Sequence, residues 1–163
     1  MEEHGWTCEC IRCREVGMND AEPGTVELDI HTYEAGGGTE HFISAEDFEQ
    51  DLLIGFCRLR FPSFADGQPG APGTESDAIR HELEDAALIR ELHVYGSEVG
   101  VGEASGDDHQ HRGYGRRLLE TAEAMAADAG FEKLSVISGI GVREYYREKL
   151  EYYQDGPYVS KRL

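Results

Sequence analysis

Gln110-His111-Arg112-Gly113-Tyr114-Gly115 is the stretch of this 163-residue chain that decides its fold. It stands between an apolar run at 87–94 and a segment of helical period that begins at Arg116. Glycines let the main chain approach a ligand closely, and the first amides of a helix favour an anion there. The stretch therefore predicts a pyrophosphate-binding loop, to which Arg112 and Arg116 would add charge. A turn with glycine for packing is the plainer alternative.

The segments on either side of this loop alternate strand and helix. Apolar residues at 118, 119, 122, 125, 126 and 129 share one helical face, and Gly130 ends the helix. We expect buried strands at 87–94 and 134–139, a short helix at 142–150 and a final strand at 158–163.

The first half of the chain has the period of strands. Residues 25–33 alternate apolar and polar side chains, Gly36-Gly37-Gly38 makes a turn, and the alternation resumes at 41–43, which predicts a hairpin. Another strand is expected at 52–61, and residues 63–77 form a flexible loop rich in glycine, proline and acids. Antiparallel strands followed by strand–helix–strand units predict an α+β fold with a mixed sheet.

The charge balance is strongly acidic. Thirty-three acids face fifteen bases, a net charge of −18, and only three bases are lysines. Such self-repulsion is tolerable in concentrated salt, so we expect a halophilic source, with an ordinary acidic protein as the alternative. Acidity lowers the expectation of RNA binding without excluding it, because a local arginine cluster can dominate a contact. The sequence shows neither a long apolar run nor a secretory signal, so no membrane contact and a cytoplasmic location are expected.

The glycine loop resembles a known one. G-x-G here continues neither as a dinucleotide fingerprint nor as a P-loop, but Q-x-x-G-x-G between strand and helix resembles the coenzyme A loop of the GNAT acetyltransferases. The strings C-E-C-I-R-C-R-E, L-I-R-E-L-H-V-Y-G, Q-H-R-G-Y-G, V-I-S-G-I-G-V-R-E-Y-Y-R and D-G-P-Y-V-S-K also stand in the order typical of the Elongator catalytic subunit family. That resemblance covers residues 8–161 apart from the 63–77 loop. Glu151 departs from it, because the family has glycine there.

The resemblance implies roles for particular residues. Acetyl-CoA would bind to the main chain of the strand before the loop and to the loop itself, with Tyr146 beside the thioester sulfur as general acid and Tyr145 as second choice. Glu91 and His93 are candidate bases on one strand face. An ordinary strand, two core tyrosines and a surface glutamate are the plainer interpretations. The implied cofactor-binding residues are Glu91, Leu92, His93, Val94, Gln110, His111, Arg112, Gly113, Tyr114, Gly115, Arg116 and Tyr146.

Four cysteines suggest a metal site. C-x-C-x-x-C brings Cys8, Cys10 and Cys13 within reach of one zinc ion, and Cys57 is the natural fourth ligand, with His4 or another histidine as alternative. The resembled family carries zinc at this junction. A redox disulfide is less expected in the cytoplasm. We therefore divide the chain into a Cys-rich zinc-binding segment at 1–20 and an acetyltransferase domain at 21–163.

The resembled family modifies the wobble uridine of tRNA. Its radical-SAM half, which needs an iron–sulfur cluster and S-adenosylmethionine, is absent from this sequence. The expected activity is acetyl donation for that modification, with tRNA as partner and Arg12, Arg14, Arg58 and Arg60 as candidate RNA contacts. Acetylation of lysine in a basic peptide and a non-catalytic acetyl-CoA-binding role are the alternatives.

Overall fold

The computed structural model describes residues 8–19, 21–62, 81–95 and 113–163. The expected 63–77 loop and residues 110–112 of the glycine loop lie outside these ranges. The elements in chain order are α1 (Ile11–Arg14), η2 (Val16–Met18), β1 (Glu27–Ala35), β2 (Gly38–Asp47), β3 (Leu52–Phe61), η5 (His81–Leu83), β4 (Ala86–Val94), α2 (Tyr114–Asp128), β5 (Lys133–Val136), η6 (Ile140–Val142), α3 (Arg143–Lys149), β6 (Tyr153–Asp155) and β7 (Tyr158–Arg162).

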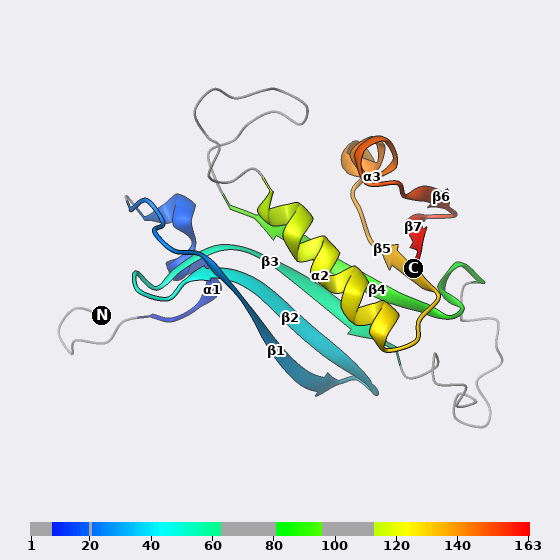
Figure 1. Cartoon of the computed structure of the whole chain (residues 1–163), viewed down its shortest axis with the longest axis horizontal. Coiled ribbons are helices and arrows are strands. Elements are labelled where there is room, and N and C mark those ends of the chain that lie inside the picture. The colour runs from blue at the N-terminus through cyan, green and yellow to red at the C-terminus, as the bar shows by residue number, and fades with distance from the viewer. Residues whose placement is uncertain (1–7, 20, 63–80, 96–112) are drawn as a thin grey trace.

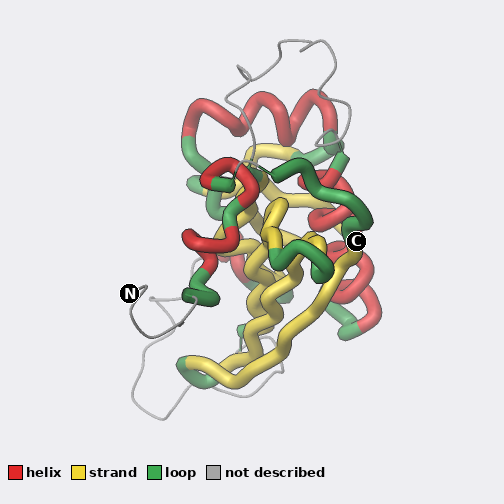
Figure 2. The backbone as a smooth tube through the Cα atoms, turned by 90° about the vertical axis from the view of Figure 1, so that its left-hand side faces the viewer, coloured by secondary structure: helices red, strands yellow, loops and turns green. Residues whose placement is uncertain are grey.

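The strands form one seven-stranded sheet in the order β1-β2-β3-β4-β5-β7-β6. The β4–β5 pair is parallel, whereas the other neighbours are antiparallel. The hairpin and the strand at 52–61 are confirmed, and so is the α+β class with a mixed sheet. The helices lie at the periphery of this strand layer (Figure 2).

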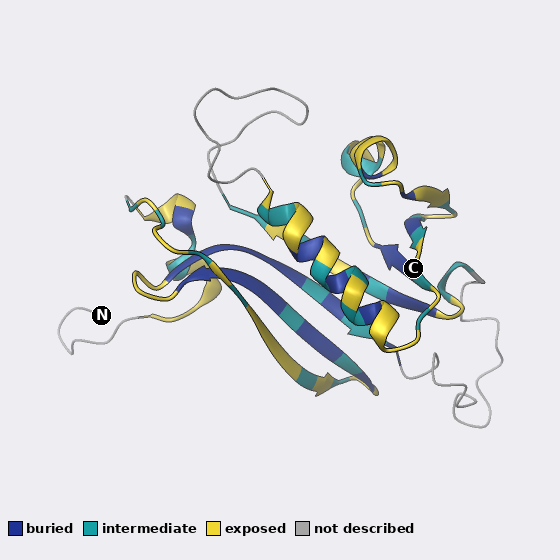
Figure 3. Cartoon of the chain, viewed as in Figure 1, coloured by how far each residue is buried: buried dark blue, intermediate teal, exposed yellow. Residues whose placement is uncertain are grey.

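Helix α2 closes the hydrophobic core by lying across one face of the sheet, over β2, β3, β4 and β5 (Figure 1). Its inward stripe consists of Leu118, Leu119, Ala122 and Ala126, all of which are buried. The outward residues of α2 and most of edge strand β1 are exposed (Figure 3). Gly130 follows with φ of 90°, a left-handed conformation that favours glycine at a helix end. The expected helical face is thus the one that covers the sheet.

Two parts of the chain differ from expectation. Strand β5 ends at Val136 rather than at residue 139, and Ile137 after it is half exposed. The Cys-containing segment also joins the main core, because Val16 is only 7% exposed and Glu15 forms a bridge with Leu53 of β3. Within the described residues, no helix is long and apolar enough to cross a membrane.

Candidate functional site

The parallel pair of strands opens halfway along its length. Residues 86–89 of β4 pair with 133–136 of β5, and the Ile137 amide donates a last hydrogen bond of 2.9 Å to the Ile89 carbonyl. Beyond that point the described part of β5 offers β4 no partner. The β5-facing main-chain groups of residues 90–94 are therefore available to a ligand, since main-chain polar groups require a partner.

A β-bulge lies where the strands begin to diverge. On its other edge β4 pairs with β3, and the register passes from Ile89–Leu59 to Glu91–Arg58 without using Arg90. An extra residue of this kind bends a strand and increases its twist. The bulge therefore explains why β4 turns away from β5 at this position.

The N-terminus of α2 lies against the end of the opened strand. A methyl group added at Gly115 would stand 3.3 Å from Cγ2 of Val94, and Gly113 before it has φ of 122°. Glycine is thus required at Gly113 by conformation and favoured at Gly115 by the close approach of the helix. Tyr114 is partly buried between them. Arg116 is exposed and pairs with Glu120 at 2.7 Å, so its charge stays on the surface beside the helix terminus.

Side chains of the opened strand point alternately to the two faces of the sheet. Glu91 is paired in register with Arg58 and His93 with Phe56, which puts both candidate bases on one face, as expected. Both are exposed, and Glu91 lies 3.9 Å from the Arg58 guanidinium. Leu92, paired with Cys57, points to the opposite face, towards α2. Val94 is paired with Gly55 on that face and is half-buried.

The two candidate tyrosines have different surroundings. Tyr146 is 6% exposed, whereas Tyr145 is 45% exposed. Burial raises the pKa of Tyr146 to about 12, and the nearby Cys57 thiol acts in the same direction. Because Cys57 is the register partner of Leu92, the Tyr146 phenol lies on the α2 side of the opened strand, whereas Glu91 lies on the other side. The site therefore has a candidate acid and a candidate base on opposite faces of the sheet.

Sequence reasoning missed Tyr152, which supports this tyrosine pair. Its ring makes a T-shaped contact with that of Tyr146, with centroids 5.4 Å apart, and its hydroxyl donates to Glu123 at 2.9 Å. Lys161 donates to the other Glu123 oxygen at 2.8 Å. Burial first, and then the Glu123 charge, raise the pKa of Tyr152. Glu123, Tyr152 and Lys161 come from separate segments of the chain, so a short sequence pattern could not have revealed their contact.

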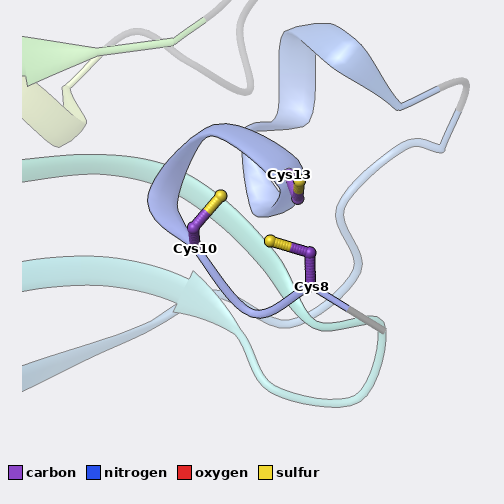
Figure 4. A group of neighbouring side chains, drawn as sticks. All are labelled: Cys8, Cys10 and Cys13. Carbon is purple, nitrogen blue, oxygen red and sulfur yellow. The ribbon is translucent and has the colours of Figure 1, made fainter. Parts of the chain in front are cut away.

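The structure brings three of the four cysteines together. The sulfur atoms of Cys8, Cys10 and Cys13 lie within 4.8 Å of one another and are turned towards a common space (Figure 4). The Cys13 amide, followed by the neighbouring thiols, lowers the pKa of Cys10 to about 7. Hydrogen bonds shared with Cys8 and Cys10 raise the pKa of Cys13 to about 11. Metal binding by such thiols would release their protons.

Cys57 is not part of this cluster, which corrects the expectation that it supplies the fourth ligand. Its side chain is fully buried in the core under α2, and burial raises its thiol pKa to about 12. A metal ligand must lie within reach of the ion, and Cys57 is not among the sulfur atoms that lie within 4.8 Å of one another. His4, the alternative, lies outside the described residues.

Three of the four candidate RNA-contacting arginines are already paired with acids. Arg14 binds Glu46 and Asp51, and Arg60 bonds to buried Glu40 at 2.9 Å. As noted above, Arg58 lies near Glu91. Arg12 is exposed on α1 and has no ion pair with any described residue. The positive charge available for a phosphate contact is thus smaller than the sequence suggests.

An opened parallel pair beside a glycine-led helix is the arrangement expected of an acetyl-CoA site, and residues 17–152 match the Acetyltransferase (GNAT) family. The chain belongs to that family. It is 44% identical over its whole length to Elongator complex protein 3 of Drosophila melanogaster, covering 28% of that protein. It is 45% identical to the tRNA uridine(34) acetyltransferase of Methanocaldococcus jannaschii, covering all of this chain and 29% of that protein.

One solved structure supports the same assignment. The archaeal Methanocaldococcus infernus Elp3 with an N-terminal deletion is 42% identical, with a TM-score of 0.79 over the whole of this chain and 37% of that one. The chain spans less than a third of the length of the two curated relatives, the Drosophila melanogaster and Methanocaldococcus jannaschii proteins. Both the expected GNAT fold and the resemblance to the Elongator family are confirmed.

Proposed function

We propose that this chain is the acetyl-donating domain of an enzyme that modifies the wobble uridine of tRNA. The observation that carries the proposal is the opening of β4 from β5 beyond Ile89, next to the glycine-led end of α2. Family membership supports acetyl transfer, and the relatives named tRNA uridine(34) acetyltransferase support the nucleic acid substrate. We further propose a cytoplasmic location for this activity.

The main chain would bind the donor. Residues 91–94 would hydrogen-bond the pantetheine arm, and an amide of that strand would face the thioester oxygen as it gains negative charge. One preorganised donor of this kind is worth about 3 kcal/mol in an acyl transfer. The amides around Gly113 and Gly115 would bind the pyrophosphate, together with the loop residues Gln110, His111 and Arg112 and with Arg116 at the surface.

Side chains would manage the protons. As the acceptor nucleophile forms its bond to the acetyl carbon, the C–S bond breaks and the sulfur leaves as a thiolate. Glu91 would receive the acceptor's proton on one face of the sheet, directly or through water. Tyr146 would donate a hydrogen bond to the sulfur on the other face, with Tyr145 as the alternative. The Glu91 carboxylate and the Tyr146 hydroxyl would thus act from opposite faces of the sheet on a thioester bound in the opening between β4 and β5.

The cysteine cluster fits a structural zinc ion. Thiolates around a tetrahedral zinc, at a Zn–S distance of about 2.3 Å, lie about 3.8 Å apart, and the three sulfur atoms already lie within 4.8 Å. Cys8, Cys10 and Cys13 would hold the ion, and a histidine or a group from outside the described residues would complete it. Its contribution would be to fix the segment that packs Val16 against β3.

Paired variants test this assignment. Metal analysis of Cys13→Ser should show lost zinc and a lower melting temperature. Cys57→Ser should also melt lower, because it places a hydroxyl in the core, but it should retain the metal. Wild-type protein that folds without zinc would end the proposal.

The reaction itself is tested by acetyl-CoA turnover with and without tRNA. Calorimetry should first detect binding of coenzyme A, and tRNA should then stimulate release of free CoA. The relatives are longer, and we propose that a radical-SAM half, with its iron–sulfur cluster and S-adenosylmethionine, completes the modification. Stimulation by a basic peptide in place of tRNA would favour lysine acetylation, and binding without turnover would favour a non-catalytic domain.

A further inference from the structure

A buried carboxylate lies on β2, which β3 separates from the opened strand β4. Glu40 of β2 is 1% exposed, and its Oε1 accepts hydrogen bonds from Arg60 at 2.9 Å and from Arg90 at 2.7 Å. Its Oε2 is buried and has no partner among the described residues. Burial opposes the charge, but the two guanidinium groups outweigh it and lower the pKa of Glu40. The carboxylate thus depends on both arginines.

The two arginines anchor different parts of the sheet. Arg60 also donates to the carbonyl groups of Ala35 at 2.9 Å and Gly36 at 2.9 Å, which ties Glu40 to the turn between β1 and β2. Arg90 is the bulge residue of β4, directly after the last β4–β5 pair at Ile89. Its side chain is 43% exposed, and that of Arg60 is 19% exposed. Glu40 therefore links the point of divergence to a fixed hairpin.

The position of the bulge determines which main-chain groups the opening presents. Successive residues of a strand point their side chains to opposite faces, so a register shift of one residue moves every following side chain to the other face. A bulge displaced from Arg90 into residues 91–94 would therefore reverse the faces of the residues between its old and its new position. It would also turn different amides of that stretch towards β5. The proposed donor contacts therefore need the bulge to stay at Arg90.

We propose that the Glu40–Arg90 ion pair is a positioning device that holds the β4 bulge and so presents residues 91–94 to the acetyl donor. The inference rests on the proposed acetyl-CoA site and assigns to it two residues that do not touch the donor. A buried ion pair is poor evidence of added stability but can specify a geometry. Here the geometry is the direction in which the side chains and amides of residues 91–94 point.

The matched pair Arg90→Met and Arg60→Met tests the proposal, because each variant removes one of the two partners of Glu40. Arg90→Met should weaken coenzyme A binding and raise the KM for acetyl-CoA about tenfold, the effect of about one lost hydrogen bond. Its kcat should also fall, because an amide of residues 91–94 faces the thioester oxygen, and its melting temperature should fall by the cost of one lost partner of Glu40. Arg60→Met loses the turn contacts as well, so it should melt lower and yet bind coenzyme A like the wild type. Arg90→Lys, which keeps the charge, should recover most of the affinity.

The outcomes separate this proposal from the one it rests on. Calorimetry with wild-type protein comes first, and a lack of coenzyme A binding there overturns both. If the wild type binds and Arg90→Met binds equally well, the positioning role is wrong and the acetyl-CoA site stands. The positioning role is also wrong if Arg90→Met and Arg60→Met each lose coenzyme A affinity in proportion to the fall in their melting temperatures. Amide hydrogen exchange at residues 91–94 should change in Arg90→Met and not in Arg60→Met.

Discussion

Replacing Tyr146 by phenylalanine isolates one hydroxyl group at the candidate site. The ring would keep its T-shaped contact with Tyr152, so the variant should stay folded. Burial raises the phenol pKa to about 12, whereas an ordinary thiol has a pKa of about 8.5. Complete proton transfer to a thiolate would therefore be uphill by about 5 kcal/mol. A hydrogen bond from the protonated phenol to the leaving sulfur is the role that this environment favours.

The magnitude follows from the strength of that bond. Hydrogen bonds to charged groups contribute about 1.5–3 kcal/mol, which corresponds to a fall in kcat of about 10- to 150-fold. Affinity for acetyl-CoA should change little, because the negative charge on sulfur develops only in the transition state.

The assay is release of free CoA under saturating acetyl-CoA, with calorimetry for affinity. Tyr153→Phe, which alters an exposed tyrosine of β6, is the matched control and should keep the wild-type rate. An unchanged kcat in a folded Tyr146→Phe protein that binds coenzyme A normally would refute this reasoning and direct attention to Tyr145.

Three further perturbations address the strand, the buried acid and the net charge. Gly55→Ala should lower the melting temperature and weaken coenzyme A binding, because the added methyl group would stand 2.8 Å from the His93 carbonyl oxygen. Overpacking of this kind costs about 1–3 kcal/mol. A melting temperature equal to that of the wild type would contradict this prediction. The lowered pKa of Glu40 gives stability that is present above the unfolded value of about 4.3 and is lost as pH falls through the folded pKa. Glu40→Gln should therefore melt lower than wild type at pH 7, and the two curves should converge in acid. Finally, a chain of net charge −18 should gain thermal stability with added KCl; greater stability in dilute buffer would argue against a halophilic source.

Local patterns predicted the elements whose causes are local. The helical face of α2 follows from side-chain period, the ten residues of β3 follow from a largely apolar run that Pro62 closes, and a spacing motif found the three clustered cysteines. Glu151 was identified as a departure from glycine, and it has φ of 63°, a conformation that glycine adopts more easily.

Tertiary causes lay beyond these patterns. The apolar run after residue 133 does not show where β5 separates from β4, so the strand was expected to be longer than it is. The Glu40 network joins residues 20 and 50 positions apart, and no short motif reports such a contact. Cys57 was a different kind of error. Along the strand Cys57 alternates with Arg58 and Arg60 and falls on the same face as Leu59 and Phe61. The alternation of side chains alone therefore assigned Cys57 to the apolar face.

The contrast between the cysteines makes the chain its own reporter of unfolding. Three thiols are exposed and the fourth is enclosed, with a pKa of about 12. A thiol-reactive dye added to metal-free protein would label the exposed set first, since reaction requires a thiol that the dye can reach. Cys57 would be labelled only when the sheet and α2 separate, so the slow fraction of the dye signal would time the opening of the core without any introduced probe.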